Sequence, residues 1–263
     1  MSAGEISPEQ VLYAAILTLP RIFVAMTVLP FLSPAIISGT VRGLLAFALV
    51  ILVIPLTYMH LERMTLQPAL LLFLLPKEIL IGLILGFLAA IPFWVAAGLG
   101  RLMDMQRGSF MATMFSPAFQ DAASPLGTLF TQAVTVVFFT TAGVHLFLGA
   151  LYESYLVWPV HHVAPGFAEG GANLVADLFQ SIFYWIAVLG APLIILVLLI
   201  DLLMGILNRF IPEVNVFFLA FPFKAALVMF VLVIYADILM GGFAREWLNN
   251  EGWFRPLQQI LVH

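Results

Sequence analysis

Six long apolar stretches constrain the fold more than any other feature of this sequence. They cover residues 11–32, 43–59, 70–97, 126–151, 174–204 and 214–240. Each is near or above the roughly 20 residues that a helix needs to cross a bilayer. Within lipid, every backbone polar group must find its hydrogen bond inside the protein. We therefore expect an all-α integral membrane protein with multiple passes, whose long helices pair as hairpins.

The composition supports a membrane protein. Hydrophobic residues make up 63% of the 263 residues and charged residues only 9%, whereas about a quarter of the residues in a soluble domain are charged. So few charges cannot cover a water-exposed surface. Because no linker or repeat divides the chain, we expect one domain over residues 1–263, with a C-terminal helical hairpin region over residues 174–240.

Several of the helices are expected to be broken. Pro92, Pro192 and Pro222 lie inside apolar stretches. Proline lacks a backbone donor and clashes with the preceding helical turn, so each is a candidate break point. Small residues also recur at helical spacing, at Gly82, Gly86 and Ala90. Such a stripe predicts that two helices approach closely there.

The arginines near the ends of the stretches do not orient the chain. If all six stretches cross the membrane, one side collects Arg42, Arg101, Arg107 and Arg209, and the other collects Arg63, Arg245 and Arg255. Cytoplasmic loops normally carry a clear excess of Lys and Arg. We therefore expect that some of these stretches are covered by protein rather than by lipid.

No pattern predicts catalysis, a metal site or a cofactor. The sequence has no G-x-S-x-G, H-E-x-x-H or P-loop motif. Cysteine is absent, so no thiolate nucleophile or Cys-based metal site can form. His161 and His162 are adjacent and have no acids at ligand spacing, which favours a polar loop over a metal centre. A net charge of −4 gives no basic excess for nucleic acid.

Charges inside the apolar stretches are the most informative polar residues. Placing a charge at the centre of a membrane helix costs about 2.5–3.5 kcal/mol unless the charge is paired or hydrated. Lys77 and Glu78 are consecutive, so on a helix they project about 100° apart and are expected to need other partners. The charged residues concerned are Arg21, Lys77, Glu78, Asp201, Lys224 and Asp237.

Asp201 and Lys224 are expected to meet. A hairpin turn around Pro212 and Glu213 leaves the two residues at equal distance from the tip, and therefore at the same depth. One interpretation is a proton-linked site of the kind that transporters use. The other is a structural pair that sets the register of the hairpin or contacts partner subunits. We favour the structural pair, because one acid and one lysine make a poor proton relay.

The segment over residues 98–125 combines Met and Phe with charges, glycine and prolines. It is too polar for lipid and too apolar for a solvated loop. Irregular backbone at membrane depth must be covered by protein or line a water-filled path, and a Met/Phe cluster seals well around changing shapes. A channel plug is one interpretation. A kinked amphipathic helix at the membrane surface is the other, and composition alone favours it because such helices are common.

Several short blocks follow one another along nearly the whole chain. They are Pro20-Arg21, Lys77-Glu78, Asp104-Met105-Gln106-Arg107-Gly108, Ser116-Pro117, Ser124-Pro125-Leu126-Gly127, Trp158-Pro159, Asn208 to Phe217, and Pro222-Phe223-Lys224. Together these blocks resemble the SctT/FliR family, the export-gate subunit of bacterial type III secretion systems. Arg107 and the Trp158-Pro159 block look more like the injectisome branch, SctT, than the flagellar branch, FliR.

The resemblance implies a function. Family members join two smaller sister subunits, SctR (FliP-like) and SctS (FliQ-like), in a helical, cone-shaped complex. Together with other export-apparatus membrane proteins, this complex passes unfolded secreted proteins out of the cytoplasm. It lies in the inner membrane and much of it is raised towards the periplasm. The subunit is not an enzyme and needs no cofactor.

The resemblance also implies roles for particular residues. The loop that matches residues 106–123 or so is a plug in the closed channel. The residues predicted to gate are Gln106, Arg107, Gly108, Phe110, Met111, Met114, Phe115 and Pro117. The charged residues predicted to be buried and to serve assembly are Arg21, Lys77, Glu78, Asp201, Arg209 and Lys224.

The alternative function is a small proton-coupled secondary transporter that uses Asp201 and Lys224. A transporter should be stable alone and bind a small solute. A gate subunit should be unstable alone and should co-purify with hydrophobic partners. An intramembrane enzyme is less well supported, because no nucleophile and base stand at helical spacing.

Overall fold

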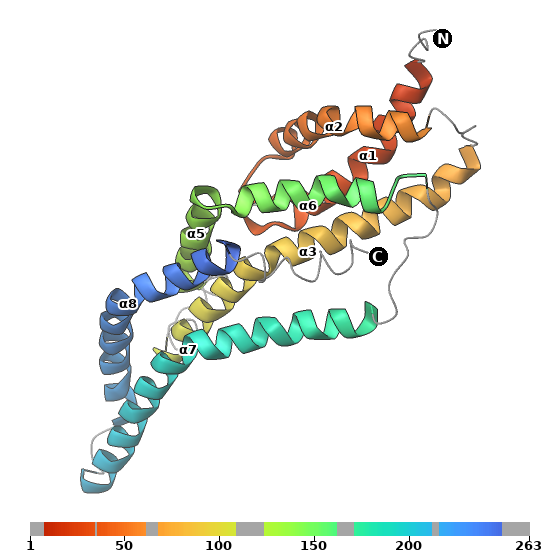
Figure 1. Ribbon diagram of the computed structural model, residues 1–263. Helices are drawn as coiled ribbons and strands as arrows, with labels where there is room; N and C mark the ends of the chain where they lie inside the picture. Colours follow the sequence, from red (N-terminus) through yellow and green to blue (C-terminus); the bar gives the residue numbers. More distant parts are fainter. Residues whose placement is uncertain are drawn as a thin grey trace. The chain divides into compact units, whose positions relative to one another are not determined.

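The computed structural model describes residues 8–34, 36–61, 68–108, 124–161, 171–211 and 216–248 (Figure 1). This part of the chain is helical and contains no strand, which confirms the all-α prediction. The elements are α1 (Pro8–Val28), a 3-10 helix η1 (Pro30–Leu32), α2 (Gly39–Leu61), α3 (Pro68–Gln106), α5 (Pro125–Thr140), α6 (Gly143–Val157), α7 (Gly171–Phe210) and α8 (Val216–Leu248).

Within the described ranges, five helices are long and apolar enough to cross a membrane, or six if α5 and α6 together count as one span. This agrees with a multi-pass membrane protein. The five are α1, α2, and parts of α3, α7 and α8 over Leu71–Gln106, Phe179–Phe210 and Phe218–Arg245.

The helices group into two compact units. The first contains α1, α2, α3 up to Ile91, and α6. The second contains the rest of α3, α5, α7 from Asp177, and α8. The boundaries between the two units fall inside α3 and α7, so neither unit is one continuous stretch of sequence. The single domain over residues 1–263 stays a prediction.

None of the three candidate prolines ends a helix. Pro92 lies within α3, Pro192 within α7 and Pro222 within α8. Prolines are tolerated in membrane helices where neighbouring groups satisfy the freed carbonyls. Near its middle, where Pro192 lies, α7 changes direction (Figure 1).

A break that the sequence analysis did not predict divides the stretch 126–151. Helix α5 ends at Thr140, and Thr141 has extended backbone angles (φ −106°, ψ −163°). The Thr140 hydroxyl donates to the Val136 carbonyl at 2.9 Å and the Thr141 hydroxyl to the Val137 carbonyl at 2.7 Å. Side-chain bonds of this kind compete with the helical pattern. The helix thus ends without a proline, at residues whose hydroxyls bond back to it.

In the first unit, α1 packs against α2 and its buried side chains include Ala14, Leu17, Ile22 and Ala25. The predicted small-residue stripe lies at the contact between α3 and α1. A Cβ atom added at Gly86 would come within 2.6 Å of the Ala25 carbonyl oxygen, and one at Gly82 would overlap the Arg21 carbonyl. The two backbones therefore touch, as the stripe predicted.

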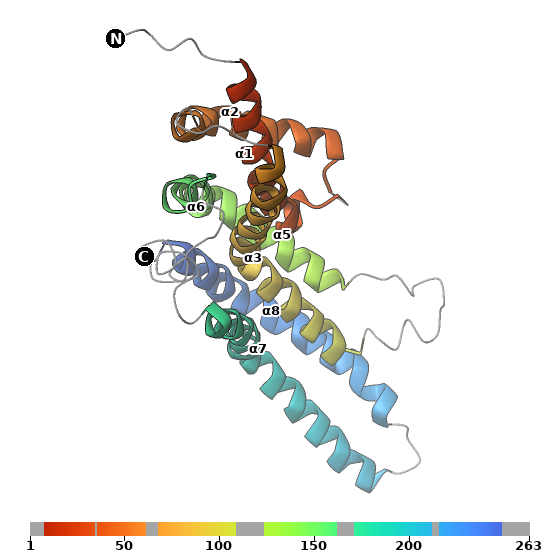
Figure 2. The ribbon, with the colours of Figure 1, turned by 90° about the vertical axis from the view of Figure 1, so that its right-hand side faces the viewer.

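In the second unit, α7 and α8 form an antiparallel hairpin (Figures 1 and 2), and α5 packs against α8. The Phe93 ring of α3 meets the Phe138 ring of α5 edge to face at 5.5 Å. In its most apolar part α3 is 67% buried within the chain, whereas α7 is only 17% buried and α8 22%. The outer faces of this hairpin therefore need cover from lipid or from other proteins.

Candidate functional site

The candidate gating segment begins where α3 ends. Gln106 is the last residue of α3, and Arg107 and Gly108 follow in a turn, with the Gly108 amide donating to the Met105 carbonyl at 3.1 Å. Gly108 has a φ of +82°, which residues with side chains rarely adopt. A Cβ atom there would also overlap the Phe221 ring of α8. Both constraints require glycine at this position.

The remaining residues predicted to gate fall in the range 109–123, outside the described residues. They are Phe110, Met111, Met114, Phe115 and Pro117. Their gating role stays a prediction, as does that of Gln106, Arg107 and Gly108.

Asp104 is a functional candidate that the sequence analysis did not select. Its carboxylate is almost fully buried. One oxygen, Oδ1, pairs with the Arg107 guanidinium at 2.6 Å. The other, Oδ2, accepts from the Leu126 amide at 3.0 Å and from the Ser124 hydroxyl. Asp104 therefore joins the end of α3 to the start of α5.

Ser124 is the second residue that sequence reasoning missed. Its hydroxyl oxygen accepts from the Gly127 amide at 2.9 Å, and Pro125 occupies the first turn of α5. A serine followed by proline is a typical helix start. The Ser124-Pro125 pair, together with an acid three residues before Arg107, was the signal that could have identified this contact.

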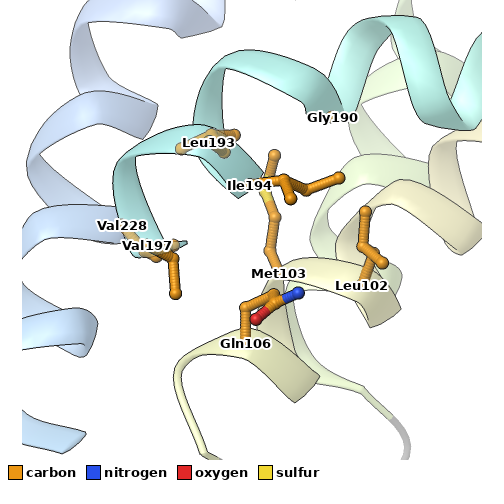
Figure 3. A pocket seen from close by; sticks show the side chains of 8 residues that line it. All are labelled: Leu102, Met103, Gln106, Gly190, Leu193, Ile194, Val197 and Val228. Atoms are coloured by element: carbon orange, nitrogen blue, oxygen red, sulfur yellow. The ribbon is translucent and has the colours of Figure 1, made fainter. Parts of the chain in front are cut away.

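A small apolar hollow with an internal volume of only about 10 Å³ lies beside Gln106 (Figure 3). Gly190 of α7 leaves space there, because a Cβ atom at that position would come within 3.0 Å of the Leu102 side chain. Pockets that bind small molecules usually measure about 300–1,000 Å³. This pocket is smaller and carries one polar side chain, the Gln106 amide. The lining residues are Leu102, Met103, Gln106, Gly190, Leu193, Ile194, Val197 and Val228.

A buried charge network lies in the first unit. Arg21 of α1 is fully buried and binds Glu78 of α3 with two hydrogen bonds, of 2.6 Å from Nε and 3.0 Å from Nη2. It also donates to the Ser154 hydroxyl at 3.1 Å and the Trp158 carbonyl at 2.9 Å. The Tyr155 ring lies 4.0 Å from the guanidinium carbon. Such bidentate pairing is the strongest form of Arg–carboxylate contact.

Lys77 completes the network. Its ammonium lies 2.7 Å from a Glu78 carboxylate oxygen, and it donates to the carbonyls of Pro159 at 3.2 Å and Val160 at 2.9 Å. As expected, each of these consecutive residues has another partner, Arg21 for Glu78 and the two carbonyls for Lys77, and in addition the two side chains meet each other. The two carbonyls that accept from Lys77 follow the end of α6 at Val157. The C-terminal end of a helix favours a positive charge.

The structure thus brings Arg21, Lys77 and Glu78 together. Ser154, Tyr155 and the carbonyls of residues 158–160 are partners that sequence reasoning missed. Trp158-Pro159 belongs to the blocks that carry the family resemblance, but its contact with buried charges depends on the packing of three helices. No local pattern could have revealed it.

Asp201 and Lys224 meet as predicted, as an ion pair between α7 and α8. Asp201 is 50% exposed and the Lys224 side chain 10%. Arg209 is exposed at the last turn of α7 and belongs to neither charge cluster. What these charges do in an assembly stays a prediction.

Comparison with known proteins identifies the family. The sequence model of "Bacterial export proteins, family 1" matches residues 12–249. This chain belongs to that family. The match spans both compact units and every described helix except for the first residues of α1.

Individual relatives of this export protein come from both branches of the family. "Yop proteins translocation protein T" of Yersinia pestis is 35% identical over 237 residues, covering 88% of this chain and 89% of that protein. "Secretion system apparatus protein SsaT" of Salmonella typhimurium is 35% identical over 61% of this chain and 62% of its own length. "Flagellar biosynthetic protein FliR" of Bacillus subtilis is 30% identical over 62% of this chain and 63% of its own length.

The export protein is therefore a membrane protein of the type III secretion export apparatus family. The Yersinia protein and SsaT, at 35% identity, are more similar to this chain than FliR of Bacillus subtilis at 30%, but a FliR protein of Aquifex aeolicus also matches over 89% of the chain, so the injectisome branch stays a prediction. The comparisons do not support the transporter alternative.

Proposed function

We propose that this chain is a non-enzymatic subunit of the type III secretion export gate. In this proposal it builds, with SctR/FliP-like and SctS/FliQ-like sister subunits, the channel through which unfolded proteins cross the bacterial inner membrane. The observation that carries the proposal is the family match over residues 12–249. Much of the assembly is proposed to be raised towards the periplasm as a helical cone.

The exposed surface of the hairpin supports a role in an assembly. Leu198 and Leu202 on α7, and Phe230 and Val233 on α8, are each more than half exposed. Asp201, itself half exposed, lies in the same apolar hairpin. A carboxylate in an apolar membrane surface is costly against lipid, whereas protein can offer it donors. Sister subunits, with lipid at the outer margin, are the proposed cover.

The segment over residues 98–125 is the proposed channel plug. Its start is firmly held, because Leu99 and Met103 are buried and Gly108 accommodates the ring of Phe221. Gln106, Arg107 and Gly108 then lead into the Met- and Phe-rich residues. An apolar constriction blocks a channel by excluding water. A plug of this composition that extends from a fixed helix end would close a channel without catalysis.

The test is to delete Ser109–Phe115 in the complex assembled with its sister subunits. The measurement is the flux of ions or small solutes across the inner membrane, per assembled complex. A leak above the parent level is expected. A matched variant replaces the same residues with a Gly/Ser linker, which keeps the length but removes Met and Phe, and it should leak too. A deletion complex as tight as the parent would overturn the plug.

A further inference from the structure

We propose that Asp104 is a positioning residue for the channel plug: its carboxylate fastens the end of α3 to the start of α5. The chain on either side of the middle of the proposed plug, residues 109–123, is then anchored at one place. This inference rests on the proposed function, because the chain between these two helices is the part proposed to close the channel. The contacts that carry it all lie within the second unit.

The first observation is the set of donors around Asp104. A buried carboxylate must be paired or hydrogen-bonded, since an isolated one is strongly disfavoured. Asp104 is 4% exposed and receives Arg107 at one oxygen, and the Leu126 amide and Ser124 hydroxyl at the other. The donors lie on both sides of residues 109–123. One side chain therefore ties together two points that are separated along the chain by residues 109–123, the middle of the proposed plug.

The second observation is the way in which α5 begins. The first amides of a helix lack partners within the helix, and they favour a negative charge. The Ser124 hydroxyl accepts from the Gly127 amide, and the Asp104 carboxylate accepts from the Leu126 amide. The start of α5 is thus capped partly by its own serine and partly by another helix. A cap shared in this way fixes the distance between the two helix ends.

The third observation is the close approach of the two backbones next to this contact. Gly100 lies one helical turn before Asp104 on α3, and a Cβ atom there would overlap the backbone of Leu126 and Gly127. Helices that touch backbone to backbone have little freedom to slide, because interiors are close-packed. The backbones of α3 and α5 are therefore already close at this point, and the hydrogen bonds of Asp104 fix their relative orientation.

The arrangement has a consequence for Arg107, which is one of the predicted gating residues. Its guanidinium is held against Asp104 and is only partly exposed. A neutral side chain at position 104 removes this ion pair and also weakens the contact to Ser124. The plug then keeps its composition but loses the anchor that sets where it lies. We therefore expect a leak in a complex that assembles normally.

The experiment uses the complex assembled with its sister subunits, and small-solute flux per assembled complex as the readout. Asp104→Asn and Ser124→Ala should each raise the flux above the parent. The double variant should leak no more than the leakier single variant, because both substitutions break the same contact. Ser124→Thr keeps the hydroxyl and should stay at the parent level. A merely structural role would lower the yield of complex and leave the flux per complex unchanged.

Two control variants match the chemistry of the substitutions. Thr40→Val removes an exposed hydroxyl in the first turn of α2, and Glu9→Gln neutralises an exposed acid at the start of α1. Both should keep the parent flux. Parent flux in Asp104→Asn and Ser124→Ala, or flux that simply adds in the double variant, overturns the proposal. If Asp104→Asn does not assemble, equal flux in Ser124→Ala and Ser124→Thr overturns it.

Deletion of Ser109–Phe115, measured in parallel, separates this inference from the proposed function. If the deletion leaks while Asp104→Asn and Ser124→Ala stay tight, the anchoring role is wrong and the plug stands. If the deletion itself stays tight, the plug is wrong, whatever the point substitutions do.

Discussion

The Asp201 carboxylate of α7 and the Lys224 ammonium of α8 form an ion pair across the C-terminal hairpin. Lys224 is nearly buried and Asp201 is half exposed, so the pair lies at the margin of this chain. Each charge alone would be costly among apolar side chains. The pair therefore fixes the register of the two helices. Half of the Asp201 side-chain surface is not covered by any described part of this chain.

Lys224→Met should reduce the stability of the hairpin and the yield of the assembled complex. The lysine would no longer compensate Asp201, at an expected cost of about 1 kcal/mol, because a half-exposed acid is partly stabilised by its surroundings. The measurement is the amount of complex recovered through a tagged sister subunit. Asp201→Asn combined with Lys224→Met should recover part of the yield, because no uncompensated charge then remains.

The two interpretations of this pair predict different results for the same variant. If Lys224→Met assembles at the parent level but loses a proton-coupled activity, the structural interpretation is wrong and the transporter alternative gains support. Reduced assembly, with partial recovery in the double variant, supports a pair that sets the register of α7 and α8.

Arg21→Met should be far more damaging than Lys224→Met. It leaves Glu78, which is fully buried, with Lys77 as its remaining cation among the described residues, and it removes the hydrogen bond from Arg21 to the Trp158 carbonyl. Breaking a buried charge pair by removing one partner costs about 3–5 kcal/mol. The measurement is again complex yield, together with the thermal unfolding midpoint in detergent.

Arg21→Lys tests whether geometry or charge matters in this network. Lysine keeps the positive charge but cannot make the two parallel bonds to Glu78, so we expect most of the loss to persist. Arg245→Gln, at an exposed position on α8, is the control and should match the parent. Full recovery by Arg21→Lys would mean that charge alone is required.

The fold was largely predictable from the sequence, because apolar length is a local property. The stretches 43–59 and 214–240 correspond to α2 and α8, with ends displaced by a few residues. Breaks were less predictable. Pro192 and Pro222 both lie within helices that continue past them. The actual helix end lies at Thr140, where no proline occurs.

A contact between two helices could be predicted only where both residues lie at the same number of positions from one turn. Asp201 and Lys224 lie equally far from one turn, so their meeting follows from counting residues. The partners of Arg21 lie on two other helices, 57 and 133 positions away for Glu78 and Ser154. Asp104 and Ser124 lie only 20 positions apart, but the residues between them give no regular geometry from which to count. These contacts arise from three-dimensional packing.

Gly108→Ala should destabilise the complex for two separable reasons. The φ of +82° disfavours any side chain by about 1–2 kcal/mol, and the new methyl group overlaps the Phe221 ring. Combining Gly108→Ala with Phe221→Leu should relieve the overlap but not the backbone strain. The expected order of unfolding midpoints in detergent is parent first, the double variant next and Gly108→Ala lowest, with Phe221→Leu alone measured as the reference. A Gly108→Ala complex as stable as the parent would show that this turn is not held as described.

Gly86→Ala should weaken the contact between α1 and α3, whereas Gly43→Ala should not. The added methyl group at Gly86 would lie 2.6 Å from the Ala25 carbonyl oxygen and 2.9 Å from the Val28 Cβ atom, so the helices must separate. Overpacking of this kind costs about 1–3 kcal/mol. Gly43, on α2 in the same unit, has no atom of a more distant described residue within 4 Å of the added Cβ, and alanine is the better helix former by about 1 kcal/mol. The two substitutions should therefore shift the unfolding midpoint of the purified complex in opposite directions. A lower midpoint for Gly43→Ala as well would mean that a partner helix approaches α2 at that glycine, since no described part of this chain does.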